Sequence, residues 1–461
     1  MLAHLETLSR AGRARLGLPR LSTPARHGWA NAHELADLAA FADFNRDRYA
    51  ITSVPAADIA TAAPSALCHK RPCSFGEWFA FTAASTERAF VDAAGIYRTS
   101  ASVDKPRFDW ASGRRRLALN GGSTNLLVRS SELATSPWAA SGAVAVTADA
   151  GTAPDGTLTA DLVADTTAAD VNGVTQNCPI TSSANPYTAS CFLKAGTSSV
   201  VSLRVTIGAS SVVAEVVANL ATGEAQWRSG VAGTSFSITP HGNGWYRLAL
   251  TCADNASGNN SINLIIRPAF AASYSGTIGI AATGNVLAWG AQIEQSAFAT
   301  PYIATTSSTV TRAAETCRMS PVIEALLQRD TASIVVRGGL SHPAGAGRIV
   351  GTVTGSGLIC GSSTSGEIVS RDVANSRSLS ATLGSGTTAS FGAAYGFDGD
   401  GQALVGNGGN VASNAHVPDA RTTVFLGRSA SGFHADGGYD FVGIAPTRLS
   451  DARLAALATR A

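Results

Sequence analysis

Apolar and polar positions alternate most clearly in residues 285–294, where successive side chains would point to opposite faces of a strand. One face would carry Val286, Ala288, Gly290 and Gln292, and the other Leu287, Trp289, Ala291 and Ile293. We expect Leu287, Trp289 and Ile293 to face a core. Pro301 ends regular pairing, and the Thr- and Ser-rich residues after it predict an extended connector. The pattern therefore predicts that one β-domain ends here and that another β-domain follows.

The same pattern predicts a first β-sandwich over residues 125–313. Turns rich in Gly, Asn and Asp separate eight candidate strands, a spacing that is typical of a sandwich. The strands cover residues 143–147, 187–194, 199–207, 212–219, 236–239, 245–252, 262–268 and 286–293. Eight strands of this kind fit two stacked Greek-key sheets, which is a jelly roll.

Residues 320–461 predict a second β-sandwich. A short helix or connector over residues 319–328 precedes nine candidate strands between residues 332 and 445. Ser450 is a suitable N-cap for a final helix, with Leu454 and Leu457 packed inward. The Asp398-Gly399-Asp400-Gly401 segment predicts a hairpin turn, although its carboxylates could also contribute to a structural calcium site.

The first 124 residues follow other patterns. Residues 1–50 place apolar side chains at helical spacing, as in Leu2, Leu5 and Leu8 and again over residues 32–44. We expect a partly helical attachment arm here, and the alternative is a solvated N-terminus. Residues 51–124 predict a small β segment, with a hairpin at Asp92 to Gly95. The predicted fold is mainly β, with two tandem β-sandwich modules preceded by a short partly helical N-terminal arm.

Composition limits the classes of partner. Charged residues make up only 14% of the 461, the net charge is +2, and there are 47 glycines, which suits a β-rich chain. This balance gives no bulk electrostatic reason to expect nucleic acid or an anionic membrane as a partner. No apolar run is long enough for a membrane helix, and the N-terminus lacks the apolar region of a secretory signal. We therefore expect synthesis in a bacterial cytoplasm without membrane insertion.

The seven cysteines are an odd number, which argues against a complete disulfide framework. Cys68 and Cys73 flank His69, but no second pair follows at the spacing of a zinc site. We therefore predict no metal and no cofactor.

Several motifs resemble bacteriophage tail-fibre, tailspike and head-fibre (head-spike) proteins, including those of phage-like gene transfer agents. In order along the chain they are Asn125 to Glu132 with Trp138, Thr152 to Asp161, Gly244 to Leu248, Trp289 to Glu294 with Phe298, Pro301 to Ile303, and Thr311 to Ala314. The segment before the jelly roll resembles the same family at Ser85-Thr86 and Phe90 to Asp92 but departs from it twice. Ala83 stands where the family usually has Arg, and the acidic residue that the family usually has near Leu119 and Asn120 is absent.

The ending of the chain is similar to a concanavalin A-like (laminin G-like) module. The matching segments are Leu426 to Arg428, Gly437 to Tyr439 and Thr447 to Leu454. Together the resemblances imply a carbohydrate-binding-like jelly roll and a terminal concanavalin A/laminin G-like sandwich on an adsorption protein of a phage or phage-like particle.

Sugar binding uses aromatic faces together with planar polar side chains. Trp227 lies between turn signals and has polar neighbours, so we predict a carbohydrate site there. The candidate residues are Trp227, Glu224, Gln226, Arg228 and Trp138. Core packing or a contact between subunits is the alternative for Trp227, and Trp245 and Trp289 are expected in the core.

Catalysis has weaker signals. Carboxyl pairs such as Asp436 with Asp440, or Glu215 with Glu224, occur in any β-protein of this size. No nucleophile elbow, zinc-protease motif, phosphate loop or β-helix repeat is present, so we predict a protein that is not an enzyme.

The resulting hypothesis is a structural spike or fibre protein on the surface of a phage or gene-transfer-agent particle. Its N-terminal arm would bind capsid or tail proteins, and its modules would bind capsular polysaccharide of the host as a homo-oligomer. The alternatives are a glycan-cleaving tailspike-type enzyme built on the terminal module and a structural spacer without a ligand.

Overall fold

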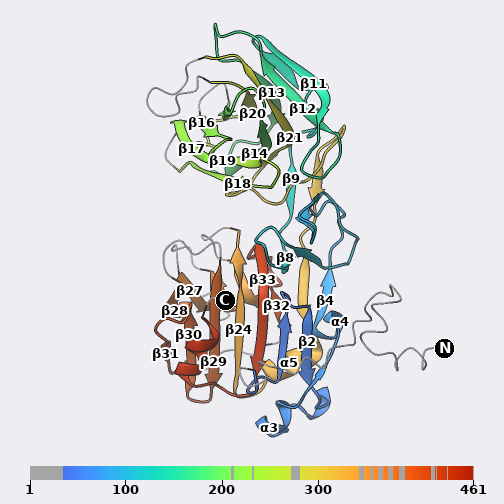
Figure 1. Ribbon diagram of the computed structural model, residues 1–461. Coiled ribbons are helices and arrows are strands. Elements are labelled where there is room, and N and C mark those ends of the chain that lie inside the picture. Colours follow the sequence, from blue (N-terminus) through green and yellow to red (C-terminus); the bar gives the residue numbers. More distant parts are fainter. Residues whose placement is uncertain are drawn as a thin grey trace, which may run out of the picture. The chain divides into compact units, whose positions relative to one another are not determined.

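The computed structural model contains two β-sandwiches (Figure 1), and the prediction of a mainly β fold is confirmed. The structure describes residues 35–459 except 209–211, 231–232, 271–280, 342–346, 353–356, 362–366, 372–376, 384–389, 417–420, 422 and 433. Residues 39–461 form one unit and residues 1–38 another. No helix among the described residues is long and apolar enough to span a membrane.

The jelly roll consists of two six-stranded antiparallel sheets. The first has the order β10 (Ala139–Ser141), β13 (Gly173–Pro179), β20 (Ser261–Arg267), β15 (Val200–Ile207), β16 (Val212–Asn219) and β17 (Glu224–Ser229). The second has the order β11 (Val144–Gly151), β12 (Ala160–Asp165), β21 (Gly284–Glu294), β14 (Pro186–Ala195), β19 (Trp245–Ala253) and β18 (Ser235–Pro240). Both sheets contribute buried leucines to one shared core, among them Leu203, Leu264, Leu193 and Leu250.

A bulge in β21 changes the predicted facing of residues 286–293. Opposite Cys191, β21 places both Gly290 and Ala291, and Gly290 has a φ of 64°. The extra residue reverses the alternation. As a result Val286 and Ile293 both face the sandwich core, while Trp289 lies on the other face of the sheet. The prediction that Leu287, Trp289 and Ile293 share one face was therefore wrong.

Trp289 still becomes buried, in a separate aromatic cluster. Its ring lies 5.4 Å from Phe192 and 4.9 Å from Tyr302, and Tyr97 packs against the same group. Trp245 belongs to this cluster as well, so the expectation that both tryptophans are core residues is confirmed.

The second sandwich pairs a ten-stranded sheet with a seven-stranded sheet. The larger sheet has the order β3 (Lys70–Pro72), β2 (Arg48–Thr52), β1 (Ala40–Asp43), β33 (Gly437–Ala445), β24 (Ala332–Leu340), β29 (Phe391–Asp398), β30 (Gly401–Gly406) and β31 (Ala412–Asn414), with β8 (Arg116–Leu119) beside β33 and β7 (Arg107–Asp109) beside β8. The smaller has the order β28 (Arg377–Thr382), β27 (Glu367–Arg371), β26 (Gly357–Gly361), β25 (Arg348–Gly351), β32 (Phe425–Leu426), β23 (Thr316–Met319) and β4 (Phe79–Thr82).

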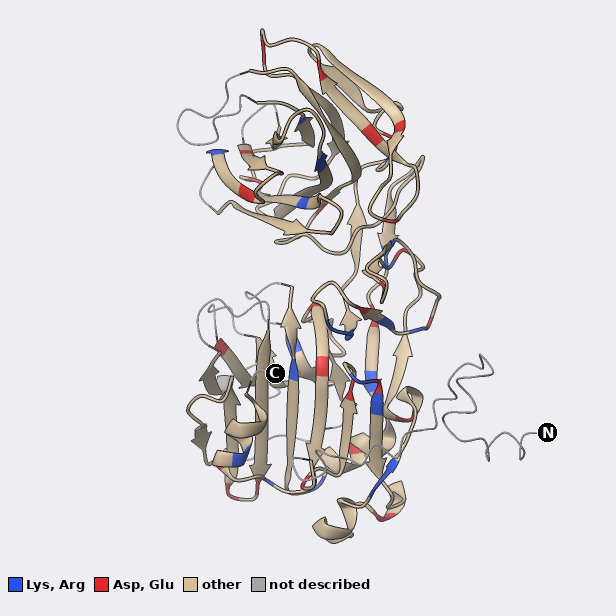
Figure 2. Cartoon of the chain, viewed as in Figure 1, with Lys and Arg blue, Asp and Glu red and all other residues tan. Residues whose placement is uncertain are grey.

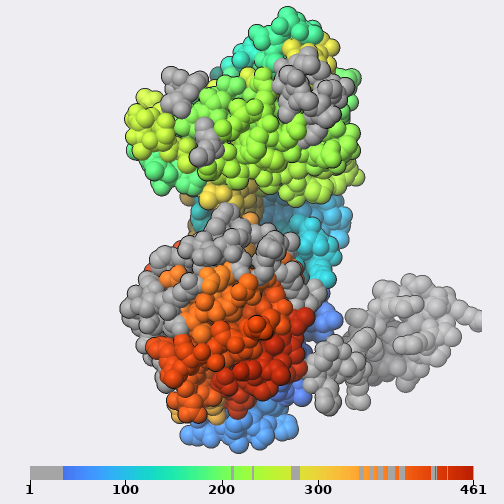
Figure 3. Space-filling model, turned by 90° about the vertical axis from the view of Figure 1, so that its left-hand side faces the viewer, coloured from blue at the N-terminus to red at the C-terminus, as the bar shows by residue number. Residues whose placement is uncertain are grey.

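This sandwich takes strands from both sides of the jelly roll in the sequence. β1 pairs with β33, and β4 pairs with β23. In Figure 3 the blue surface of the N-terminal segment accordingly adjoins the orange and red surface of the C-terminal strands. The jelly roll is thus an insertion, entered through β9 (Ser123–Asn125) and left through β22 (Val310–Arg312), which pair with each other. The predicted ranges 1–50, 51–124 and 320–461 all contribute strands to the sheets of the second sandwich.

The helix predicted over residues 32–44 was wrong in its described part, because residues 40–43 form β1. All four side chains of Ala40–Asp43 are buried, so tertiary pairing with β33 outweighs their helical spacing. The rest of the predicted arm up to residue 34 lies outside the described residues.

Short helices connect the strands: η1 (Ala56–Asp58), α3 (Pro64–Leu67), α4 (Phe75–Trp78), α5 (Pro321–Leu327) and α6 (Asp451–Leu457). The last two confirm predictions, and the Ser450 side chain caps α6 by accepting from the Arg453 N–H. A hairpin of β5 (Phe90–Val91) and β6 (Tyr97–Arg98) confirms the turn at Asp92 to Gly95. Asp398 to Gly401 join β29 to β30, which confirms the other hairpin.

Candidate functional site

β17 carries four of the five predicted binding residues and forms an edge of the first jelly-roll sheet. Residues paired across antiparallel strands share a face, and Trp227 pairs with the core residue Val216. Trp227 is half-buried, and its ring packs edge-on against Phe236 at 5.0 Å. This geometry favours the core-packing alternative for Trp227. Gln226 pairs with Val217 and lies on the opposite, outer face.

The Arg228 side chain also lies on the outer face. A bulge in β17 follows Trp227 and aligns Ser229 with Glu215, which brings Arg228 to the side of the sheet where Glu215 lies. Three arginines converge on the Glu215 carboxylate: Arg228 at 2.7 Å, Arg267 at 2.7 Å and Arg204 at 3.3 Å. The Ser202 hydroxyl donates to the same carboxylate at 2.7 Å. We call Glu215 with Arg204, Arg228 and Arg267 the arginine cluster.

The arginine cluster has an excess of positive charge, since three guanidiniums surround one carboxylate and leave a sum of +2. The Glu215 side chain is 1% exposed, whereas those of Arg204, Arg228 and Arg267 are 24%, 27% and 14% exposed. Charged side chains are sparse on the jelly-roll strands (Figure 2), so this convergence stands apart. Guanidinium N–H groups that Glu215 does not use can therefore reach an anion from solvent.

Burial alone would raise the pKa of Glu215, but Arg267, Ser202 and Arg228 hold it below its usual value. Glu215 therefore stays ionised and organises the guanidiniums rather than exchanging a proton. Arg228 also lies over the Phe270 ring at 5.6 Å, which restricts the orientation of its guanidinium. A rigid set of planar donors suits carboxylate or other oxyanion groups.

The remaining predicted residues lie elsewhere. Glu224 is exposed at the start of β17, and its carboxylate accepts from the Thr222 hydroxyl. Trp138 is buried, and its indole N–H donates to the Arg129 carbonyl at 2.9 Å. The structure thus places Arg228 and Gln226 on the outer face and brings neither tryptophan to them.

Sequence reasoning missed Arg204 and Arg267 and considered Glu215 only as half of a carboxyl pair. A usable signal existed: each is a single charged residue at an alternating position within an apolar strand. A charge at such a position must find a partner, because it is too costly to bury alone. The sequence did not reveal which strands are neighbours.

A second group of ion pairs lies at the junction, where the chain enters and leaves the jelly roll. Glu315 pairs there with Arg88 at 2.9 Å and with Arg107 at 2.6 Å, and all three side chains are buried. The Asn120 backbone N–H donates to Glu315, and its side-chain oxygen accepts from Arg107 at 2.5 Å. Asn120 therefore satisfies Arg107 without the acidic residue expected in that region.

No group of three or more His, Cys, Asp or Glu side chains within the described ranges is arranged to hold a metal ion. Asp398 instead accepts from the Asp400 N–H within its turn.

The chain matches no protein-family model and no curated protein. Among solved structures it is similar to the enzymatically active domain of tailspike protein 4 of bacteriophage CBA120, with 14% identity and a TM-score of 0.23. The match covers 37% of this chain and 21% of that one, so it spans about a fifth of the tailspike domain's length. That domain is enzymatically active, which contradicts our prediction of a protein that is not an enzyme, and we withdraw it.

Proposed function

We propose that this chain is a fibre- or spike-type surface protein of a phage or phage-like particle, and that its jelly roll binds acidic polysaccharide at the arginine cluster. The observation that carries the proposal is the convergence of Arg204, Arg228 and Arg267 on one buried carboxylate at the outer face of a sheet. The sequence motifs shared with tail-fibre, tailspike and head-spike proteins support the particle surface as its location.

An acidic polysaccharide suits this face for two reasons. Planar guanidiniums bind carboxylates through paired N–H donors. Polar side chains on the strands of this sheet, such as Gln226, Thr175 and Asn263, offer donors and acceptors for sugar hydroxyls. In this proposal the N-terminal residues attach the chain to capsid or tail proteins, and several copies in a homo-oligomer raise the avidity for the polymer.

The test compares polygalacturonate with its methyl-esterified, uncharged form on the full-length protein. We expect Arg228→Gln to weaken polygalacturonate binding about tenfold, which is the loss of one charge-assisted contact. Arg129→Gln is the matched control, because Arg129 pairs with Glu132 in the same sandwich outside the cluster and is 34% exposed. Binding is measured by calorimetry, and thermal unfolding confirms that each variant is folded.

Glu215→Gln should change the affinity for polygalacturonate in the opposite direction. It keeps an acceptor for Ser202 but removes the only negative charge of the cluster, so binding of polygalacturonate should tighten. Equal binding of the esterified polymer, or equal losses in the Arg129 and Arg228 variants, would contradict the proposal. Measuring the length of the polymer after incubation distinguishes binding from cleavage. Unchanged length supports binding alone, and shortened chains support a spike that cleaves the polymer.

A further inference from the structure

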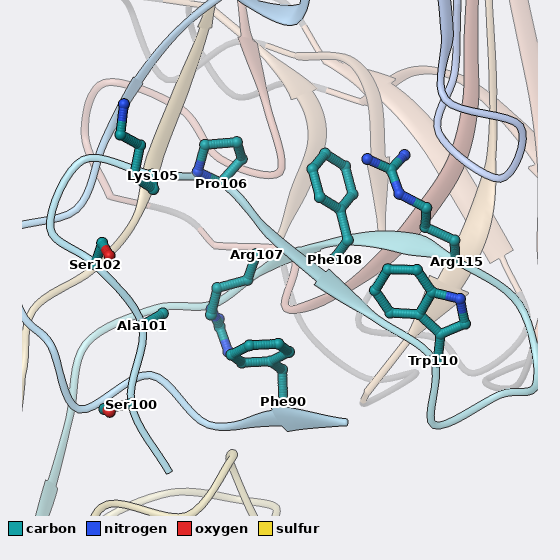
Figure 4. Close-up of a pocket in the computed structure, with 10 residues that line it drawn as sticks. All are labelled: Phe90, Ser100, Ala101, Ser102, Lys105, Pro106, Arg107, Phe108, Trp110 and Arg115. Atoms are coloured by element: carbon teal, nitrogen blue, oxygen red, sulfur yellow. The ribbon is translucent and has the colours of Figure 1, made fainter. Parts of the chain in front are cut away.

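A groove of about 530 Å³ lies within residues 90–115, away from the arginine cluster in the sequence (Figure 4). Phe90 comes from β5, Ser102 and Lys105 from the following loop, Phe108 from β7, and Trp110 and Arg115 from the turn before β8. Its size is within the range of small-ligand sites. Sequence reasoning predicted a hairpin in this region but no groove.

Aromatic rings form much of the groove wall. Phe90, Phe108 and Trp110 are each half-buried and leave part of their surface to the groove. Figure 4 shows Phe108 and Trp110 next to each other, with Arg115 beside both. The Arg115 guanidinium covers Phe108 at 3.4 Å from the ring centre, so that face is already occupied. The Trp110 ring centre is farther from the Arg115 guanidinium, at 5.9 Å, so its face is less covered than that of Phe108.

The polar part of the groove is positively charged. Lys105, Arg107 and Arg115 line it, and none of its lining residues is acidic. Arg107 is neutralised by Glu315, and Arg115 is held by Asp47 at 2.8 Å and by the Phe44 carbonyl. Within the described part of the chain, the exposed Lys105 ammonium has no ion pair or hydrogen bond. Lys105 is therefore the cation that remains for a ligand.

The acidic side chains next to the groove residues in the sequence accept hydrogen bonds from backbone N–H groups. The Asp104 carboxylate accepts from the Ala83 N–H at 2.8 Å, and the Asp109 carboxylate accepts from the Ala111 N–H at 2.6 Å. Neither lines the groove, so neither competes there for the Lys105 ammonium.

We propose that this groove is a second glycan-binding site, which takes a short acidic oligosaccharide of the uronic acid class. Trp110 lies at one end of the groove and Lys105 at the other, with Ser100 and Ser102 on the Lys105 side (Figure 4). One sugar ring therefore stacks on Trp110, the carboxylate of another sugar residue pairs with Lys105, and the Ser100 and Ser102 hydroxyls bind hydroxyl groups of the sugar. The groove goes beyond the proposed function, because it shares no residue with the arginine cluster and couples an aromatic contact to a charge contact.

The test uses trigalacturonate, its methyl ester and maltotriose with the full-length protein, read by calorimetry and by saturation-transfer NMR. Trp110→Ala should weaken trigalacturonate and its ester alike, each by about tenfold, because it removes the stacking surface. Lys105→Gln should weaken trigalacturonate by about tenfold and leave the ester unchanged. Maltotriose, which lacks a carboxylate, should bind no better than the ester. Trp110→Phe keeps a ring and should retain most of the binding, even if the alanine variant folds poorly.

Lys194→Gln is the charge-matched control, since Lys194 lies on β14, where its side chain runs past Gly244. If trisaccharide binding stays intact in Lys105→Gln, Trp110→Phe and Trp110→Ala, the proposed binding site in the groove is overturned. So would binding that only Arg228→Gln abolishes, because the ligand would then occupy the arginine cluster alone. Loss of trisaccharide binding in Lys105→Gln and Trp110→Ala, with intact polygalacturonate binding at the cluster, establishes two separate sites.

Discussion

Two clusters of arginine and glutamate in this protein differ in how much water reaches them. At the junction, the side chains of Arg88 and Glu315 are both 0% exposed. In the arginine cluster only the glutamate is sealed, and the guanidiniums keep access to solvent. Since a buried ion pair is costly to break and a solvated guanidinium can exchange partners, the junction is suited to stabilising the fold, and the cluster is suited to the binding that we propose for it.

The junction gives the first stability prediction. Glu315→Gln should lower the free energy of unfolding by about 3 kcal/mol, because it leaves Arg88 and Arg107 without their shared anion inside the protein. Glu132→Gln breaks an exposed pair with Arg129, where the side chains are 34% and 38% exposed, and should cost less than about 1 kcal/mol. Urea unfolding of the two variants measures the difference, and equal losses would contradict the structural role of Glu315.

The same variant should change the pH dependence of stability. Burial alone would raise the pKa of Glu315, but Arg107 and Arg88 hold it below its ordinary value of 4.5. A lowered carboxyl pKa stabilises the folded state above the unfolded value, and this contribution disappears as pH falls through the folded pKa. Wild-type stability should therefore decline below about pH 4.5, and the decline should be shallower in Glu315→Gln. Urea unfolding across this pH range measures both slopes, and parallel slopes would contradict the prediction.

At the residue scale, the sequence identified some of the candidate binding residues but not how they group in space. Arg228 was predicted because it adjoins Trp227, yet the two side chains serve opposite faces of β17. Glu215 and Arg267 are 52 residues apart, and no local pattern places their strands in one sheet. Strand order was needed to connect them.

At the scale of elements, the bulge at Gly290 shows how one residue directs several others. Its positive φ lets β21 serve the sandwich core with Val286 and Ile293 while Trp289 reaches the aromatic cluster of Phe192 and Tyr302. A side chain at this position would be strained, and its Cβ would lie 2.9 Å from the Phe192 ring.

Gly290→Ala should therefore destabilise the protein by about 2–4 kcal/mol, as the sum of backbone strain and overpacking against Phe192. Gly156→Ala is the matched control, because Gly156 has a φ of 84° but no atom within 4 Å of an added Cβ. It should cost only about 1 kcal/mol. Thermal unfolding distinguishes the two, and similar losses would indicate that the contact with Phe192 yields easily.

The strands that the sequence predicted best are the long apolar ones. β14, β15, β16 and β19 match candidate ranges closely, since apolar side chains occupy more than half of the positions in each strand. β12, β13 and β17 were missed, because they carry polar side chains at several positions. β17 was interpreted as a turn region, which is why Trp227 was expected to be exposed.

At the scale of the whole molecule, the chain order conceals the insertion. Two strand-rich regions separated by a connector suggest modules in sequence, and nothing local in residues 40–52 indicates a partner as distant in the sequence as β33. Pairing over this separation depends on tertiary structure. It closes the second sandwich with β1 and β2 and leaves the jelly roll attached through two strands.

The insertion can be tested by removing the jelly roll. Asn125 pairs with Val310 at the end of the β9–β22 ribbon, so an Asn-Gly turn can replace residues 126–309 and close a two-residue hairpin. The deletion also removes Phe192 and Trp289, which pack against the Tyr97 ring, so the shortened chain carries Tyr97→Ser to avoid an exposed aromatic ring. This chain should unfold cooperatively on heating. Its core would retain Trp78, whose indole donates to the Ala50 carbonyl at 2.9 Å.

Two truncations provide the contrast. A chain beginning at Ser53 lacks β1 and β2, so β33 loses the strand that covers its edge. A chain beginning at Ser320 also lacks β4, β8 and β23. Both should expose apolar core and unpaired strand edges, and both should therefore aggregate. A soluble, cooperatively folded chain from Ser320 onward would contradict the insertion, because the terminal sandwich would then need no strand from the first 124 residues.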